Sequence, residues 1–243
     1  LAGFARFATP ANGRLYLVTS QGMHDLGDYR IYERVGEGDY KFRSSIVTSE
    51  TVAADKKKTA VTRAWADQND DGQVQENEVV VTPGGFRASG YIGVSAYVNT
   101  DLSILGTLDG RGVWLKPTGF TRCGAPTYDF AQAQKAPAVG QPSLDSRFVL
   151  EWSDNWISCF DASNGKKRWT YPNPFSGVHG SHLAPGPELG LLRGCFGSVG
   201  AAQVPGAGAI WAMNGNCGEW YLFTDEGFFL AQIFQGDGTK QQW

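Results

Sequence analysis

Oxygen-bearing side chains recur at alternate positions in one short segment of the chain, which reads Asp67-Gln-Asn69-Asp-Asp71-Gly-Gln73-Val-Gln75-Glu-Asn-Glu78. The segment fits the pattern D-x-[DN]-x-[DN]-G-x5-E at every specified position. Ca²⁺ is a hard cation that binds six to eight oxygens at about 2.3–2.6 Å. The segment therefore predicts a calcium site, in which Gln75 binds directly or through water and the other ligands are Asp67, Asn69, Asp71, Gln73 (through its backbone carbonyl) and Glu78.

This segment resembles the calcium loop of EF-hand proteins, and the resemblance places an apolar anchor at Val74. A true EF-hand has a helix on each side of the loop, whereas residues 59–66 and 79–82 are rich in β-formers and Pro83 follows them. We therefore expect a β-hairpin over 59–83, pinned by a structural Ca²⁺, rather than a regulatory switch. The alternative is a solvated acidic turn, because aspartate and glycine are common in turns.

Two histidines, His179 and His182, are candidates for a second metal site or for catalysis. They are three residues apart in a proline-rich stretch, and His24 is the only other histidine in the chain. Imidazole binds Zn, Cu, Fe and Ni, so the two rings can share a metal with a third ligand from elsewhere. The alternative is a loop that uses histidine for hydrogen bonds or packing.

Three carboxylates, Glu151, Asp154 and Asp161, fall close together in the sequence. A pair of carboxylates can perform general acid–base chemistry on a glycan. The competing interpretation is that the aspartates only stabilise turns.

The cysteines at 123, 159, 195 and 217 form no C-x-x-C pair. Covalent haem attachment and a cysteine-based zinc knuckle are therefore not expected. Four cysteines permit three disulfide pairings, which the sequence does not distinguish, and the alternative is that they are small buried hydrophobes.

Composition restricts the classes of partner. The net charge is −3 and 19% of the 243 residues are charged, so no basic field indicates nucleic acid binding. No apolar run is long enough for a membrane span. We expect a secreted or periplasmic protein whose partner is a glycan, a protein or further subunits.

Glycines and aromatic residues predict an all-β fold. The 32 glycines suit tight turns, and short runs of β-formers flank Asp/Gly turns throughout the chain. We expect loops at 132–142 and 171–187 and a single domain over 1–243. The expected hairpins have turns at 36–39, 109–112, 161–165 and 225–227, with the calcium hairpin near 71.

One hairpin, Asp161-Ala-Ser-Asn-Gly-Lys-Lys-Arg-Trp169, resembles a blade repeat of quinoprotein-type β-propellers. Segments 29–42 and 224–234 resemble propeller blades in general, and more loosely. The resemblance implies short antiparallel sheets in a propeller-like fold, which is either an incomplete propeller or part of a larger protein.

Two functional hypotheses follow. The first is an extracellular, calcium-stabilised binding or scaffold module. The alternative is a propeller enzyme, either a quinoprotein-like oxidoreductase or a glycan-active enzyme, with its site near His179 and His182. No catalytic constellation stands out, so the sequence leaves open whether the chain is an enzyme.

Overall fold

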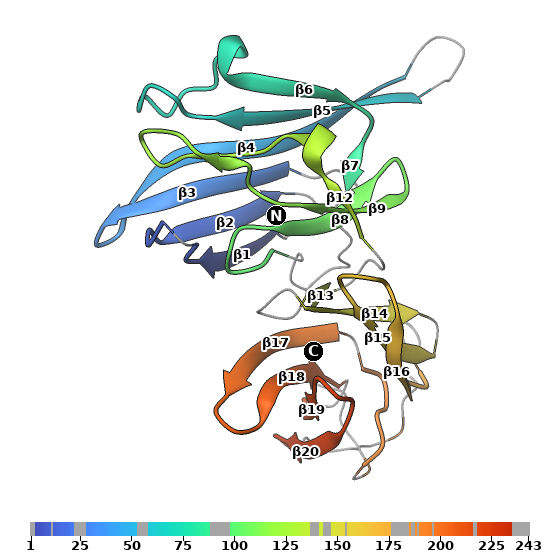
Figure 1. Ribbon diagram of the computed structural model, residues 1–243. Coiled ribbons are helices and arrows are strands. Elements are labelled where there is room, and N and C mark those ends of the chain that lie inside the picture. The colour runs from blue at the N-terminus through green and yellow to red at the C-terminus, as the bar shows by residue number, and fades with distance from the viewer. Residues whose placement is uncertain are drawn as a thin grey trace. The chain divides into compact units, whose positions relative to one another are not determined.

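The computed structural model describes residues 3–10, 12–21, 28–52, 58–87, 98–136, 141–142, 147–153, 155–175, 185, 188, 190–195, 197–215 and 218–234. The fold is all-β and propeller-like, as predicted: short antiparallel strands are joined by tight turns (Figure 1). The chain divides into two compact units, residues 1–139 and 140–243. The expectation of a single domain over 1–243 stays a prediction.

Unit 1 contains a six-stranded antiparallel sheet in which the strands follow chain order. Its strands are β1 (Gly3–Ala8), β2 (Tyr16–Gln21), β3 (Asp28–Gly36), β4 (Asp39–Val52), β5 (Lys58–Ala66) and β6 (Val79–Pro83). Both the hairpin near 37 and the calcium hairpin belong to this one sheet. The alternation of Tyr29 and Ile31 with exposed or half-buried residues confirms the period-2 strand predicted there.

A four-stranded antiparallel sheet, a two-stranded ladder and two short 3₁₀ turns complete the described part of unit 1. The four-stranded sheet has the order β12-β9-β8-β7. Its strands are β7 (Phe86–Arg87), β8 (Ile104–Leu108), β9 (Arg111–Leu115) and β12 (Gln134–Lys135). The ladder pairs β10 (Gly119–Phe120) with β11 (Pro126–Thr127), and the 3₁₀ turns are η1 (Glu76–Glu78) and η2 (Phe130–Gln132). A buried cluster joins Tyr16, Ile31 and Ile46 of the large sheet to Phe86 and Ile104 of the smaller one.

Unit 2 contains two four-stranded antiparallel sheets, each in chain order. The first consists of β13 (Gln141–Pro142), β14 (Phe148–Ser153), β15 (Trp156–Asp161) and β16 (Lys167–Pro172). The second consists of β17 (Gly197–Val204), β18 (Gly208–Asn214), β19 (Trp220–Thr224) and β20 (Phe229–Ile233). The two sheets share one buried cluster, to which the first contributes Leu150 and Ile157 and the second Trp211, Met213 and Phe223.

The predicted turns lie between paired strands. Turns at 37–38, 109–110, 162–164 and 225–226 connect β3 to β4, β8 to β9, β15 to β16 and β19 to β20. The expected loops are shorter than predicted, because β12 and β13 lie within 132–142 and β16 extends to Pro172. Among the described residues, no helix is long and apolar enough to cross a membrane.

Candidate metal centre

The predicted calcium loop connects two paired strands. β5 and β6 are antiparallel, with Trp65 opposite Val79, and residues 67–78 close the hairpin between them. The expected hairpin is therefore confirmed, and the only helical turn at its edge is the three-residue η1. This geometry lacks the two helices that an EF-hand moves against each other.

The first and last residues of the loop are both buried. The Asp67 side chain is fully buried, and Glu78 is 6% exposed. Glu78 accepts hydrogen bonds from the Trp65 indole Nε1 at 2.8 Å and from the Gln68 backbone N–H at 3.0 Å. Asp67 Oδ1 accepts one from the Asp70 backbone N–H at 2.8 Å. Both end carboxylates are therefore held in fixed orientations.

The side chains of the middle positions lie close to one another on the exposed side of the loop. Gln75 Nε2 donates to Asp71 Oδ2 at 2.6 Å, and Asn69 Nδ2 donates to the same oxygen at 3.1 Å. Gly72 has a φ of +67°, so the sharp turn predicted there is present. Val74 is 55% exposed, so it does not serve as an apolar anchor.

One group of acidic and thiol side chains among the described residues could also hold a metal ion and shares only one residue with the predicted ligand set. Ligand atoms of Asp67, Asp70 and Cys123 lie within 4.8 Å of one another. This group contains Asp67 but neither Asp71 nor Glu78. The structure thus brings together Asn69, Asp71 and Gln75 as one subset, and places Asp67 and Glu78 at the buried base of the loop.

A buried arginine, which the sequence analysis did not identify, lies beside Asp67. Arg43 on β4 donates to Asp67 Oδ2 at 3.0 Å, to Asp70 Oδ1 at 2.5 Å and to Glu33 Oε2 at 2.8 Å. Its side chain is 5% exposed. A buried charge is tolerated only when it is paired and hydrogen-bonded, and the three carboxylates meet that requirement.

These contacts shift the protonation equilibria around Arg43. Burial lowers the pKa of the Arg43 guanidinium, but its hydrogen bonds to Asp70, Glu33 and Asp67 outweigh burial and raise the pKa above its usual value. The hydrogen bonds from Arg43 and Lys41 lower the pKa of the Asp70 carboxyl. Both groups therefore remain charged near neutral pH, and the ion-pair network is fully formed there.

A second arginine extends the network to another segment of unit 1. Arg14 Nη1 donates to Glu33 Oε1 and to the Cys123 backbone carbonyl, both at 2.7 Å. Arg14, Lys41 and Arg43 thus face Glu33, Asp67 and Asp70, and the positive and negative charges balance.

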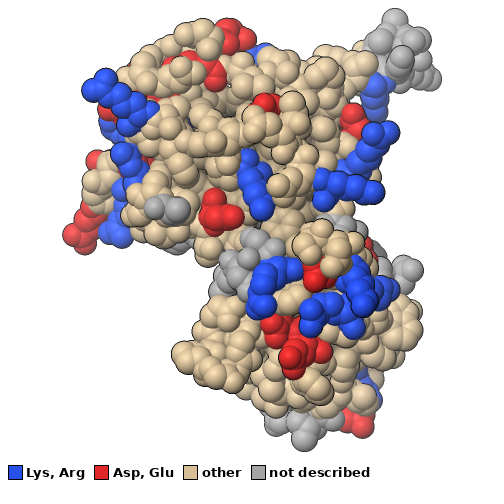
Figure 2. All heavy atoms as spheres, in the orientation of Figure 1, with Lys and Arg blue, Asp and Glu red and all other residues tan. Residues whose placement is uncertain are grey.

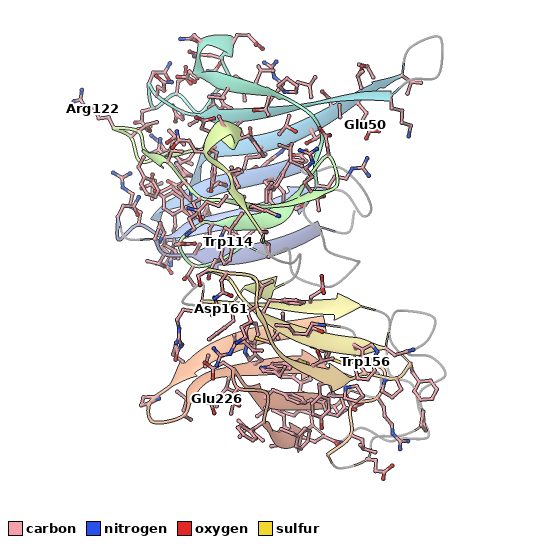
Figure 3. All side chains as sticks on the ribbon, turned by 45° about the vertical axis from the view of Figure 1, so that its right-hand side comes forward. Glu50, Trp114, Arg122, Trp156, Asp161 and Glu226 are labelled. Atoms are coloured by element: carbon pink, nitrogen blue, oxygen red, sulfur yellow. The ribbon has the colours of Figure 1, made fainter. Side chains whose placement is uncertain are left out.

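The β10–β11 ladder is attached to the first residue of the loop. The Thr121 hydroxyl donates to the Asp67 backbone carbonyl at 2.8 Å, and the Cys123 thiol donates to the same oxygen at 3.0 Å. Arg122, between them, points away from the sheets (Figure 3). The loop is therefore fixed by contacts from β4, from β5 and from the β10–β11 segment.

In unit 2, Asp161 serves as a turn residue. Its Oδ1 accepts hydrogen bonds from the Ser163 hydroxyl at 2.6 Å and the Ser163 backbone N–H at 2.9 Å, which lower the pKa of the Asp161 carboxyl. Glu151 is half-buried, and burial raises the pKa of its carboxyl. These are different environments, but the third candidate, Asp154, lies outside the described residues.

The tryptophan of the same hairpin contacts the second sheet of unit 2. Trp169 Nε1 donates to the Asp225 backbone carbonyl at 2.8 Å, and its ring lies over Gly227. Asp161 and Glu226, labelled in Figure 3, mark the turns after β15 and β19 at this end of the unit. The Trp of the predicted blade repeat therefore joins one sheet to the next.

The described cysteines are free thiols. Cys159 and Cys195 are buried in the core of unit 2, and burial raises the pKa of the Cys159 thiol to about 12. The interpretation as small buried hydrophobes fits these two. Cys217 and the three histidines, His24, His179 and His182, lie outside the described residues, so the second candidate site stays a prediction.

Comparison with known proteins identifies no family for this chain. No family model matches the chain, and no curated protein matches it.

Proposed function

We propose that this chain is a binding or scaffold module, built on propeller-like sheets, whose β5–β6 loop binds Ca²⁺. The observation that carries the proposal is the loop itself. It has the full oxygen-ligand pattern, closes a hairpin rather than a helix pair, and is held at both ends by buried contacts to Asp67 and Glu78. Such a loop favours a structural site, because its ends have no helices to move.

The arrangement of ligands supports Ca²⁺ as the ion. The side chains of Asn69, Asp71 and Gln75 lie within hydrogen-bonding distance of one another on the exposed side of the loop, where the two amide nitrogens donate to Asp71 Oδ2 and Asn69 Nδ2 also donates to Gln75 Oε1. A rotation of each amide would present its oxygen in place of its nitrogen. The base supplies the Asp67 and Glu78 carboxylates. Carboxylate, amide and carbonyl oxygens are the ligands that Ca²⁺ prefers, and six to eight of them are required.

Arg43 affects how tightly Ca²⁺ binds. Its guanidinium donates to Asp67 Oδ2, so a positive charge lies beside the first predicted ligand. This repulsion weakens cation binding, which favours a site that fills at the higher Ca²⁺ concentrations outside the cytoplasm. A secreted or periplasmic location is therefore part of the proposal. The enzyme alternative depends on His179 and His182, and no described residue favours it.

The decisive experiment compares thermal unfolding with and without Ca²⁺ in two variants. Ligand binding to the folded state alone adds RT ln(1 + [L]/Kd), or about 2.7 kcal/mol at 100 Kd, which raises Tm by about 5–10 °C for a chain of this size. Wild type should show this rise, and Glu78→Gln should lose it.

Glu76→Gln is the matched control, because Glu76 lies on the same turn η1, pairs with Arg63 and is not a predicted ligand. It should keep the rise in Tm. Glu78→Gln also loses part of its contacts to Trp65 and Gln68, so the comparison uses only the difference in Tm that Ca²⁺ causes within each variant. A wild-type Tm that is unchanged by Ca²⁺ and by chelator would overturn the proposal.

A further inference from the structure

The second sheet of unit 2 is apolar on both of its faces. On the inner face, Trp211, Met213, Tyr221 and Phe223 are fully buried in the cluster shared with β13–β16. A sheet whose second face meets water normally alternates apolar and polar residues along each strand. The strands β18 and β19 do not follow that pattern, because their outward positions are also mainly apolar.

The strand register defines the outer face. Ala202, Ile210 and Thr224 lie across from one another on β17, β18 and β19, and Ala212 lies opposite Leu222. Leu222 and Trp220 lie opposite Ala231 and Ile233 of β20. Among the described residues, the outer face of this sheet consists of Gly200, Ala202, Val204, Ile210, Ala212, Asn214, Trp220, Leu222, Thr224, Ala231 and Ile233. None of these residues is charged.

The outer face of the neighbouring sheet is mixed: it carries charged and hydroxyl side chains besides the buried Val149 and the half-buried Phe160. On β14–β16, Glu151 lies opposite Ser158, which lies opposite Thr170, and the Ser158 and Thr170 hydroxyls are hydrogen-bonded at 3.2 Å. Lys167 lies opposite Phe160 on that face. Figure 2 shows basic and acidic side chains gathered side by side near these strands. Of the two sheets of unit 2, only β17–β20 has an outer face on which none of the described residues is charged.

The rim of the apolar face is accessible to solvent. Trp220 is 37% exposed and Phe234 64%. The rings of Trp220 and Phe234 lie edge to face with centroids 5.3 Å apart. Burying a side chain of this size contributes about 1.5–3 kcal/mol, so a partner that covers the rim gains appreciable free energy.

We propose that the outer face of β17–β20 is the contact surface between two copies of this chain. Because the face is uncharged, two copies brought together on a two-fold axis have no like charges opposed. Apolar sheet faces stack at a separation of about 10 Å. An isologous contact of this kind needs one self-complementary patch, and two-fold dimers are the commonest oligomers.

The size of the face sets the expected affinity. Four strands at about 4.8 Å spacing and about six residues at about 3.3 Å each give a face of about 20 Å by 20 Å. Each copy therefore contributes about 400 Å² in projection, and the protruding rim side chains bring the total buried area near 1,000 Å². That area lies at the low end for specific interfaces, where complexes are weak, so we expect a dimer that forms at micromolar concentrations.

Sedimentation velocity of the whole chain, over protein concentrations from about 1 to 500 μM, tests the proposal. Wild type should move from monomer to dimer across this range. Leu222→Lys, in the centre of the face, and Trp220→Glu, at its edge, should each weaken the dimer at least about tenfold, because a charge is then buried in an apolar contact. Thermal unfolding confirms that each variant is folded. If Leu222→Lys does not fold, Trp220→Glu decides the test.

Val81→Glu is the control, since Val81 is also an exposed apolar residue, 53% exposed, but lies on β6 of the other unit. It should dimerise as wild type does. Wild type that stays monomeric at every concentration overturns the proposal. So does a dimer that both face variants leave intact, or one that Val81→Glu disrupts instead.

Discussion

A single guanidinium organises the base of the candidate metal centre. Arg43 is 5% exposed and contacts Glu33, Asp67 and Asp70. Arg43 directly follows the predicted hairpin segment 29–42, but its partners lie 10, 24 and 27 positions away in the sequence. Local patterns reveal strand residues, whereas a network of this kind depends on which strands pair. This is why the sequence predicted Asp67 as a ligand but not the cation beside it.

Replacing Arg43 should therefore lower the free energy of unfolding. Arg43→Met leaves Asp67 buried without a cation and Glu33 with Arg14 as its remaining partner, and breaking a buried pair on one side lowers the free energy of unfolding by about 3–5 kcal/mol. Urea denaturation measures the loss. Arg34→Met is the control, because Arg34 is exposed and the hydrogen bond described for its side chain is a 3.2 Å donation to the Gly36 carbonyl. This variant should change stability by less than about 1 kcal/mol. Equal effects would contradict the role assigned to the network.

Glu151 gives a pH-dependent prediction. Burial raises the pKa of its carboxyl, although Lys167 opposes the shift. A carboxyl whose pKa is raised on folding favours the folded state only while it is protonated, so its contribution is present at low pH and is lost as pH rises through the folded pKa. Glu151→Gln should thus stabilise the chain at pH 7 relative to wild type and have a smaller effect near pH 4.

Urea denaturation of both proteins at the two pH values checks this prediction. Lys167→Gln in the wild-type background should act in the opposite direction at pH 7, because it removes the charge that lowers the pKa of Glu151. A stability difference between Glu151→Gln and wild type that is the same at both pH values would count against the burial argument.

At the scale of the element, turn chemistry made most of the hairpins predictable. Asp and Gly adopt the backbone angles that tight turns require, so the turns at 37–38, 109–110, 162–164 and 225–226 were identified from the sequence. The size of each sheet was not predictable. Nothing local in the sequence indicates that β1–β6 join in one sheet, because pairing between successive hairpins is decided by packing.

In the turn between β19 and β20, Gly227 packs against the ring of Trp169 on β16. Gly227 has a φ of +90°, and a Cβ there would lie 2.7 Å from the Trp169 ring. Gly227→Ala should therefore add a steric clash to the backbone strain of about 1–3 kcal/mol that a positive φ imposes on alanine. It should also displace Trp169 from the Asp225 carbonyl.

Gly206→Ala, in the turn between β17 and β18, is the matched control. Its φ is +81°, but no atom lies within 4 Å of the added Cβ, so only the backbone strain applies. Gly227→Ala should lower the free energy of unfolding by at least about 1 kcal/mol more than Gly206→Ala does. If the two variants are equally stable in urea denaturation, the position of Trp169 does not depend on the close packing of its ring against Gly227.

At the scale of the whole molecule, register is what reveals the apolar outer face of β17–β20. Each strand alone is a run of β-formers, so the sequence alone indicates only strands and a turn there. The face becomes visible when Ile210, Leu222 and Ala231 are aligned across paired strands. Because side chains alternate between faces, a shift of one residue would exchange the two faces. The inner cluster around Trp211 fixes the register and therefore the outer face.

The two buried clusters predict how stability is distributed along the chain. The described residues of one cluster all lie in unit 1, and those of the other all lie in unit 2. Arg43→Met should therefore increase hydrogen exchange mainly in β3–β5, and Gly227→Ala mainly in β16 and β18–β20, since local stability follows the contacts of each cooperative region. Hydrogen exchange with peptide-level resolution measures both patterns. If either substitution accelerates exchange equally in both units, the chain unfolds as one cooperative body, and the expectation of a single domain over 1–243 is supported instead.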